Sequence, residues 1–310
     1  MKVFFAILLL LSLILGCDPS PSPDSNSSSS SKLNVATTFY PLTEFARRIG
    51  GDAVDVQCFL PEGEDPIFWK PSPEVIQKFQ QSEMILINGA EFEKWVSLTS
   101  LPAKKLVNTA HPFKEKWVRF ENAITHSHGG QDAHSHEGVD GHTWVSSSFA
   151  KIQAEEIKKA FVKARPDKKE VFEKNYKALE QELSAFEKKC SDLALLAQGK
   201  IILTSHPAYN YLGVSYGFKF KNFNFDPEEV PAEESLNELA QFLQEHPATF
   251  ILWESFPSPP IEKLFKEKLK LQSMEFSPVE NLSAEEIKSG KTFISTMKAN
   301  LENLEKALKS

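Results

Sequence analysis

The sequence predicts an α/β protein of two Rossmann-like lobes, each built on a mostly parallel sheet, joined by one long rigid helix. Short runs rich in β-forming residues alternate with amphipathic helical segments up to residue 148 and again from residue 198. The stretch between them, 149–197, is rich in helix formers and contains no strand-like run. Strand–helix–strand units at this spacing need right-handed crossovers, which make the neighbouring strands parallel.

The first lobe is predicted over 33–148 from four strand-like runs and two helices. One helix runs through LTEFARRIG and ends on Gly50-Gly51, because glycine favours the end of a helix. The other, PSPEVIQKFQQ, has proline at its start, where a helix needs no N–H donor. The strand-like runs are, in chain order, LNVATTF, VDVQCFLP, EMILINGA and KKLVNTA.

The segment 149–197 contains the predicted linking helix. Pro166-Asp167 suits a helix start, and apolar residues recur beyond it at alternating spacings of four and three, with Lys and Glu on the opposite face. This apolar face could pack against a partner chain in a coiled coil or lie across the protein's own two lobes, and we favour the second. Its members are Phe172, Tyr176, Leu179, Leu183, Phe186, Cys190 and Leu193.

The second lobe is predicted over 198–310, where the β/α alternation returns. The strand-like runs are KIILTS, FKFKNFNF, TFILWES and LQSMEFS, and the helices run through PAYNYLGVSYG, PAEESLNELAQFLQEH and PPIEKLFKEKLK. A closing helix is expected to pack on the sheet through Ile294, Met297, Leu301, Leu304 and Leu308. The two lobes therefore share a layout, although their residues show no internal repeat.

The first residues resemble an export signal. Residues 1–16 contain an apolar run that is too short to span a membrane and fits a signal peptide. The run ends in ILGC, which resembles the bacterial lipobox and implies lipidation of Cys17. Residues 17–32 then form a Ser/Pro-rich stretch that is predicted to be a flexible tether. We expect a lipid-anchored protein of the bacterial cell envelope, outside the cytoplasm, in the periplasm or at the cell surface.

The net charge and the absence of several catalytic motifs argue against some classes of function. A net charge of −7 argues against a nucleic-acid partner. The sequence has no GxGxxG, GxSxG, HExxH or Walker motif, so we expect no enzyme.

Cys58 and Cys190 could form a disulfide in an exported protein or remain two buried thiols, and the second is favoured. We expect a monomer.

Five of the eight histidines lie in the segment THSHGGQDAHSHEGVDGHTW, within the loop 125–142 and the residues directly after it. The first four form two His-x-His pairs, His126 with His128 and His134 with His136. Such a stretch can be a solvated polar linker, but two identical pairs favour weak metal chelation. Chelation should depend on pH, because metal and proton compete for imidazoles whose pKa is near 6.5.

The layout and six motifs resemble the metal-specific solute-binding proteins of bacterial ABC importers, the zinc/manganese group with a rigid linking helix. The resemblance extends from about Leu33 to Leu308 and implies a metal cleft between the lobes, with His142 and His206 as two of four ligands. It also implies an ABC permease and an ATPase as partners. The motifs are LPEGEDPIFWKPSPEVIQKF, ILINGAEFEKWV, GHTWVSSSFA, ILTSHPAYNYLGVSYGF, TFILWESFPSP and FISTMKANLENLEKAL.

The chain departs from the family pattern at the two other ligand positions. Ile67 stands where a histidine should follow Asp65-Pro66, and Ser277 stands where an aspartate should precede Pro278. Isoleucine cannot bind a metal, and a serine hydroxyl is a poor ligand for a dication. The replacement ligands could come from the loop histidines or from a nearby carboxylate. Alternatively, the cleft has lost its metal and the two histidines remain as packing groups. The loop itself offers the carboxylates Asp132, Glu137 and Asp140, and Glu64, Asp65 and Glu275 lie near the substituted positions, whereas Glu254 is expected to pair with a neighbour.

These observations predict extracytoplasmic capture of a divalent transition metal and its delivery to an ABC importer. Zinc is favoured over manganese, because the surviving ligands are imidazoles rather than carboxylates. The alternative function is a surface lipoprotein that serves as an interaction or adhesion module and has lost the high-affinity metal site.

Overall fold

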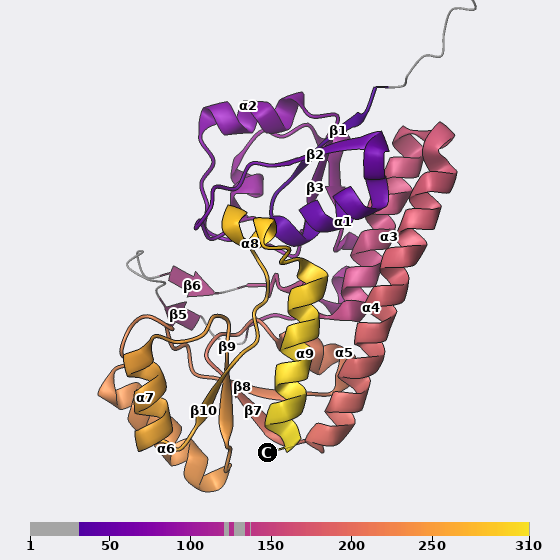
Figure 1. The fold of residues 1–310 in the computed structure, drawn as a ribbon. Helices are drawn as coiled ribbons and strands as arrows, with labels where there is room; N and C mark the ends of the chain where they lie inside the picture. Colours follow the sequence, from indigo (N-terminus) through magenta and orange to yellow (C-terminus); the bar gives the residue numbers. More distant parts are fainter. Residues whose placement is uncertain (1–30, 121–123, 127–133, 137, 310) are drawn as a thin grey trace, which may run out of the picture. The chain divides into compact units, whose positions relative to one another are not determined.

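Two four-stranded parallel sheets form the framework of the protein (Figure 1). The computed structural model describes residues 31–120, 124–126, 134–136 and 138–309, and Lys32–Ser310 form one compact unit. The first sheet has the order β2-β1-β3-β4 and the second β10-β9-β7-β8. Read from β8, the second sheet repeats the connectivity of the first, which is the shared layout that the sequence predicts. The strands are β1 (Leu33–Thr37), β2 (Val54–Cys58), β3 (Met84–Ile87), β4 (Leu106–Asn108), β7 (Ile201–Thr204), β8 (Lys219–Asn222), β9 (Phe250–Trp253) and β10 (Gln272–Glu275).

Helices cover these sheets and join them. The central strands β3 and β9 are buried along their whole length, as expected for parallel strands with both faces covered. The closing helix α9 contacts α4, α1 and β10, so its apolar face packs on other helices as well as on the sheet. The helices are α1 (Tyr40–Gly50), α2 (Pro73–Gln81), α3 (Ser147–Ala164), α4 (Lys169–Ala197), α5 (Asn210–Tyr216), α6 (Glu233–Glu245), α7 (Pro259–Lys268), α8 (Ala284–Lys288) and α9 (Phe293–Lys309).

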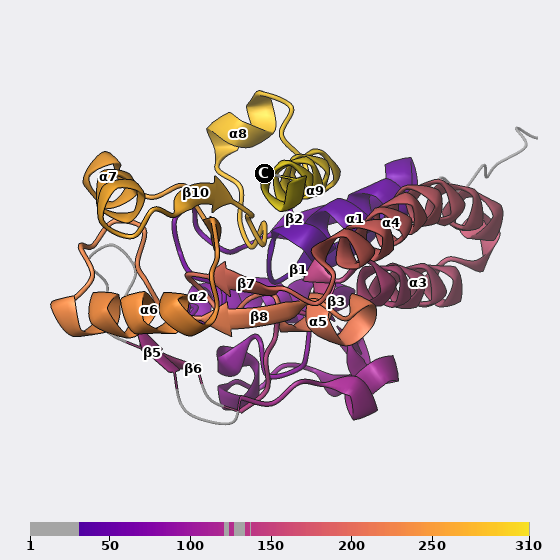
Figure 2. The same ribbon diagram turned by 90° about the horizontal axis from the view of Figure 1, so that it is seen from below.

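The linking helix is α4, which spans 29 residues. It runs beside α3 along one flank (Figures 1 and 2) and contacts α1 of the first lobe and α5 and α9 of the second. The apolar face that the sequence predicts is turned inward, and Phe172, Leu179 and Leu183 are fully buried. Because this face is covered within the chain, the coiled-coil interpretation is not needed. Helix α4 therefore connects the two sheets as one continuous element.

Three local features differ from the sequence prediction. FKFKNFNF is predicted as one strand, but β8 ends at Asn222 because Asn224 adopts a left-handed conformation with φ of 55°. Helix α8 was not expected, although Ser283 and Glu286 form a capping box at its start. The His-rich loop contains the antiparallel strands β5 (Ile124–His126) and β6 (His134–His136).

The described cysteines, Cys58 and Cys190, are unpaired, as favoured from the sequence, but only Cys190 is buried and Cys58 is half-buried. Burial raises the pKa of the Cys190 thiol to about 12, so this thiol is protonated and unreactive.

No helix in the described part of the chain has both the length and the apolar character needed to cross a membrane. The proposed signal peptide, Cys17 and nearly all of the tether lie outside the described residues.

Candidate metal centre

His142 is held in one orientation by Asp140, and Asp140 is held in turn by two residues near the start of the second lobe. Asp140 is fully buried and accepts two hydrogen bonds from His142 at Oδ1, from Nδ1 at 2.7 Å and from the backbone N–H at 3.0 Å. Its Oδ2 accepts from Asn210 Nδ2 at 3.0 Å, and its backbone oxygen accepts from the Tyr211 hydroxyl at 2.7 Å. The imidazole therefore has one orientation, with Nε2 directed away from Asp140.

The ILINGAEFEKWV segment holds the two residues next to His142, Gly141 and Thr143, through hydrogen bonds. The fully buried Asn88 donates through Nδ2 to the carbonyl oxygen of Gly141 at 2.9 Å and accepts at Oδ1 from Thr143 Oγ1 at 2.8 Å. Glu93 in turn accepts from the backbone N–H groups of Asn88 and Gly89 at 2.6 and 3.1 Å. Burial raises the pKa of Glu93, while its hydrogen bonds act in the opposite direction. This buried polar network holds both flanks of His142.

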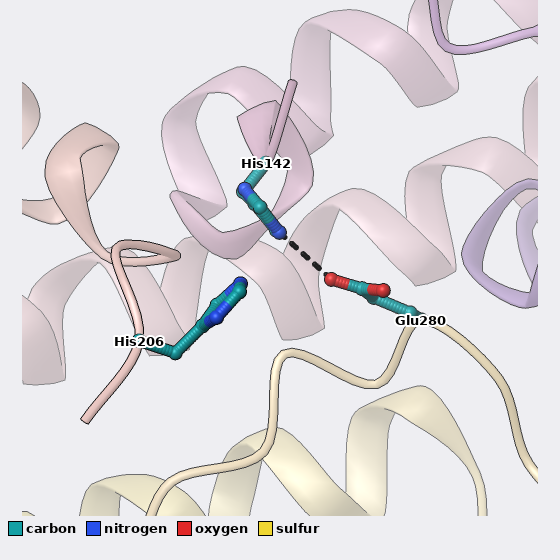
Figure 3. A group of neighbouring side chains, drawn as sticks. All are labelled: His142, His206 and Glu280. Carbon is teal, nitrogen blue, oxygen red and sulfur yellow. Dashed lines mark hydrogen bonds and ion pairs between the residues drawn. The ribbon is translucent and has the colours of Figure 1, made fainter. Parts of the chain in front are cut away.

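His206 is the second residue after β7, at the carboxyl end of a central strand of the second sheet. In an open parallel sheet this edge is where ligands bind. The His206 side chain is only 4% exposed, and its Nδ1 is 3.6 Å from Oε2 of Glu254, which follows the neighbouring strand β9. Glu254 therefore faces the Nδ1 side of the ring, and Nε2 is the nitrogen directed toward His142 and Glu280 (Figure 3).

Glu280 enters from the loop after β10. The preceding residue, Val279, is buried and has a φ of 61°, a conformation that a β-branched side chain rarely adopts. Two neighbours hold this turn. Ser277 Oγ accepts from the Val279 N–H at 3.2 Å, and Asn300 of α9 accepts from the Ser277 N–H at 3.1 Å and donates to its carbonyl oxygen at 2.7 Å. The strained turn directs Glu280 back toward the first lobe.

The three side chains converge on one point (Figure 3). One ligand atom from each of His142, His206 and Glu280 lies within 4.8 Å of the others, and His142 Nε2 is 2.7 Å from Glu280 Oε1. The two imidazole centroids are 5.6 Å apart. Two imidazoles and one carboxylate are donors that zinc accepts. Small movements of these side chains would bring all three donors within bonding distance of one ion.

His142 carries a proton in this arrangement. Burial alone would lower its pKa, but the charge and hydrogen bond of Asp140, followed by those of Glu280, raise the pKa to about 10. Both ring nitrogens then donate to a carboxylate. A metal ion that binds Nε2 must therefore displace the proton that Nε2 shares with Glu280.

Hydrogen bonds between the lobes also hold the loop that carries Glu280. Trp144 is fully buried and its Nε1 donates to the carbonyl oxygen of Pro278 at 2.7 Å. The backbone N–H of Tyr40 in α1 donates to the carbonyl oxygen of Glu280 at 3.3 Å. The Tyr209 hydroxyl donates to the carbonyl oxygen of Phe276 at 2.7 Å and ties the His206 segment to the same loop. The loop that carries Glu280 is therefore fixed from both lobes.

A pocket of about 410 Å³ borders His206 and Glu280. Ile67 and Ser277, which stand where the resemblance implies ligands, both line it. Ile67 is buried, and its backbone N–H donates to Asp65 Oδ1 at 2.7 Å. Glu64 and Asp65 also line the pocket without joining the three converging side chains. Glu275 lies elsewhere, in a separate pocket of about 620 Å³ along β10.

Sequence reasoning missed Glu280. The resemblance implies a carboxylate at the position of Ser277, whereas the residue that reaches His142 lies three positions further along the chain. The available signal was an acidic residue in the loop after a strand of a parallel sheet, since such loops meet at one edge. His128 and the side chains of His126, His134 and His136 lie outside the described residues, so their role as ligands stays a prediction.

Residues 35–307 match the family described as zinc-uptake complex component A, periplasmic (ZnuA). The chain is 30% identical over 306 residues to the high-affinity zinc uptake system protein ZnuA of Bacillus subtilis, covering 96% of this chain and 94% of that protein. It is 29% identical over 285 residues to the zinc-binding lipoprotein AdcA of Streptococcus pneumoniae, covering 88% of this chain but only 55% of AdcA, so the chain spans about half the length of that relative. The crystal structure of the Zn(II)-bound ZnuA-like domain of Streptococcus pneumoniae AdcA matches with a TM-score of 0.77 at 27% identity, covering 90% of this chain and 100% of that domain.

Proposed function

Since the chain belongs to the ZnuA family of periplasmic zinc-uptake components, we propose that it captures Zn²⁺ outside the cytoplasm and delivers it to an ABC importer. The observation that carries the proposal is the convergence of His142, His206 and Glu280 from three separate segments onto one point. Two imidazoles and a carboxylate are a donor set that zinc accepts.

Each residue has a distinct role in this proposal. His142 binds through Nε2, while Asp140 holds its Nδ1 and keeps the ring oriented. His206 binds through Nε2, with Glu254 near its Nδ1. Glu280 supplies the carboxylate and neutralises one of the two positive charges of the ion. Two imidazoles with one carboxylate favour zinc over manganese, which prefers oxygen ligands.

Release then requires a change at the contact between the lobes. The ligands come from both lobes, and α4 spans both sheets, so a small relative movement would separate Glu280 and His206 from His142. The expected range of motion is limited, because α4 is continuous and packed along its length. We propose that an ABC permease with its ATPase receives the ion, and that the chain acts by binding and release without a catalytic step.

The remaining predictions concern the parts outside the described residues. We propose a chain that is exported, lipidated at Cys17 and tethered to the envelope by residues 17–32, and that works as a monomer. The loop histidines His126, His128, His134 and His136 are proposed to collect zinc weakly near the main site. The domain bounds 33–148, 149–197 and 198–310, which fall mostly on described residues, are proposed from the sequence pattern.

Zinc titration by calorimetry tests the proposal. The chelator-stripped chain should bind one zinc ion tightly, and His206→Ala and Glu280→Gln should each weaken that site by at least tenfold. A variant lacking residues 125–138 should keep the tight site and lose only weak additional binding. If the intact chain shows weak, multiple binding that disappears with the loop, the transport proposal fails and the interaction-module alternative replaces it.

A further inference from the structure

The three converging residues leave a zinc ion one ligand short. Zinc in proteins is mostly four-coordinate and tetrahedral, and three protein ligands leave a position for water or an exogenous group. Within the described part of the chain, the cluster of candidate ligand atoms consists of His142, His206 and Glu280 alone. This inference rests on the proposed function, because it concerns the same ion.

No other described residue of the pocket joins the three converging side chains. Ile67 stands where the resemblance implies a histidine, and its side chain is apolar and only 6% exposed. The Ser277 hydroxyl accepts from the Val279 N–H, and Asp65 Oδ1 accepts from the Ile67 N–H. Glu254 faces Nδ1 of His206, on the side of the ring opposite to the nitrogen that binds the ion.

Space for an exogenous ligand is present beside His206 and Glu280. The pocket of about 410 Å³ borders His206 and Glu280 and is lined by Ile67. Ligand pockets in proteins begin at about 300 Å³, so this space accommodates a small molecule such as an imidazole together with water.

The charge of the pocket selects the kind of ligand. Its described lining contains four carboxylates and no lysine or arginine. Anionic ligands would therefore be repelled, whereas a neutral donor binds the ion without adding charge. The four acidic residues are Glu64, Asp65, Glu254 and Glu280.

We propose that the metal centre of this chain has three protein ligands and an open fourth position, and that a small neutral nitrogen donor of the imidazole class completes it from the pocket beside Ile67. Water fills the position when no such donor is present. The cargo can then enter as a zinc ion that keeps one small ligand from solution. The substitution at Ile67 thereby changes the form in which the ion is taken up.

Cobalt makes the fourth position observable. Co²⁺ replaces Zn²⁺ in such sites and absorbs visible light, with bands that shift and change in intensity when a ligand changes. The full chain loaded with one Co²⁺ should show a saturable change of these bands when imidazole is added. Acetate should need at least a tenfold higher concentration for a comparable change.

The matched variant is Ile67→His, which places an imidazole on the chain at the edge of the pocket. It should bind Co²⁺ and lose the response to added imidazole, because the fourth position is filled. Circular dichroism checks that this variant folds. Ile67→Ala gives a second comparison, since it keeps the position open and should retain the response.

Three results would overturn the inference, and they differ in what else they affect. Tight Co²⁺ binding with no response to imidazole means that the fourth position is closed, while the proposed function stands. If a response appears only after residues 125–138 are deleted, the loop supplies the missing ligand. If the chain binds no Co²⁺ or Zn²⁺ tightly, the inference and the proposed function both fail.

Discussion

Asn300→Ala tests how the loop after β10 holds Glu280 in place. Asn300 is 2% exposed and makes two hydrogen bonds to the backbone of Ser277, at 3.1 and 2.7 Å. Removing both hydrogen bonds leaves the N–H and the carbonyl oxygen of the half-buried Ser277 without these partners, which costs about 1–3 kcal/mol for each fully buried group. Because Ser277 is only half-buried, we expect the free energy of unfolding in urea to fall by about 2–4 kcal/mol, the lower part of the summed range.

The same variant should weaken zinc binding although Asn300 does not contact the ion. The left-handed conformation of Val279 costs about 1–3 kcal/mol and persists only while its surroundings enforce it. Once Ser277 is released, the turn can relax and direct Glu280 away from His142. If the competent conformation falls to about a tenth of the population, the apparent affinity for zinc falls about tenfold.

Calorimetric titration with zinc and urea unfolding are the two assays, and Asn303→Ala is the matched control on α9. Asn303 makes one long hydrogen bond, at 3.4 Å, to the carbonyl oxygen of Glu275. The control should change stability by less than about 1 kcal/mol and leave zinc affinity unchanged. If Asn300→Ala is destabilised but binds zinc like the parent chain, the turn does not position Glu280 and the reasoning is refuted.

Three further predictions follow from the buried residues. The pKa of His142 is about 10 in the metal-free protein, so zinc must displace its proton at neutral pH, and apparent affinity should fall about tenfold for each pH unit between 9 and 6. Calorimetry in buffers of different ionisation enthalpy should show at least about one proton released at pH 7.5, and release of about a tenth of a proton would contradict the assignment. Asn88→Ala removes the support of Gly141 and Thr143 and should lower the free energy of unfolding by about 3 kcal/mol, whereas a loss below 1 kcal/mol would show that the network is dispensable. Leu183→Ala, at a fully buried position in α4, should cost about 2–5 kcal/mol in the same assay, and an effect below 1 kcal/mol would mean that the linking helix is loosely packed.

The sequence was sufficient to predict most of the fold, because hydrophobic periodicity reports burial directly. The alternating spacing from Phe172 to Leu193 matches the buried face of α4. The run EMILINGA contains β3, whose four residues are all buried. Where the prediction was wrong, a local backbone feature was responsible. The aromatic residues after Asn222 suggest a longer strand, but the positive φ of Asn224 ends the regular ladder.

The proposed metal centre was only half predictable. His142 and His206 were put forward as ligands because each lies within a motif that resembles the family's, and their role as ligands stays a prediction. Glu280 was missed because its position depends on the turn at Val279, which no periodicity reports. A valine in a left-handed conformation is contrary to local preference and is imposed here by Ser277 and Asn300. Contacts between residues far apart in the sequence, such as Trp144 with Pro278, were likewise beyond sequence reasoning.

The transport proposal depends on one zinc ion held by His142, His206 and Glu280. Anomalous diffraction at the zinc absorption edge, from crystals of the zinc-loaded chain, locates the ion directly. We expect one strong peak about 2.0–2.2 Å from a nitrogen of each histidine and from a Glu280 oxygen. A principal peak on the loop histidines, or one from which Glu280 is absent, would contradict it.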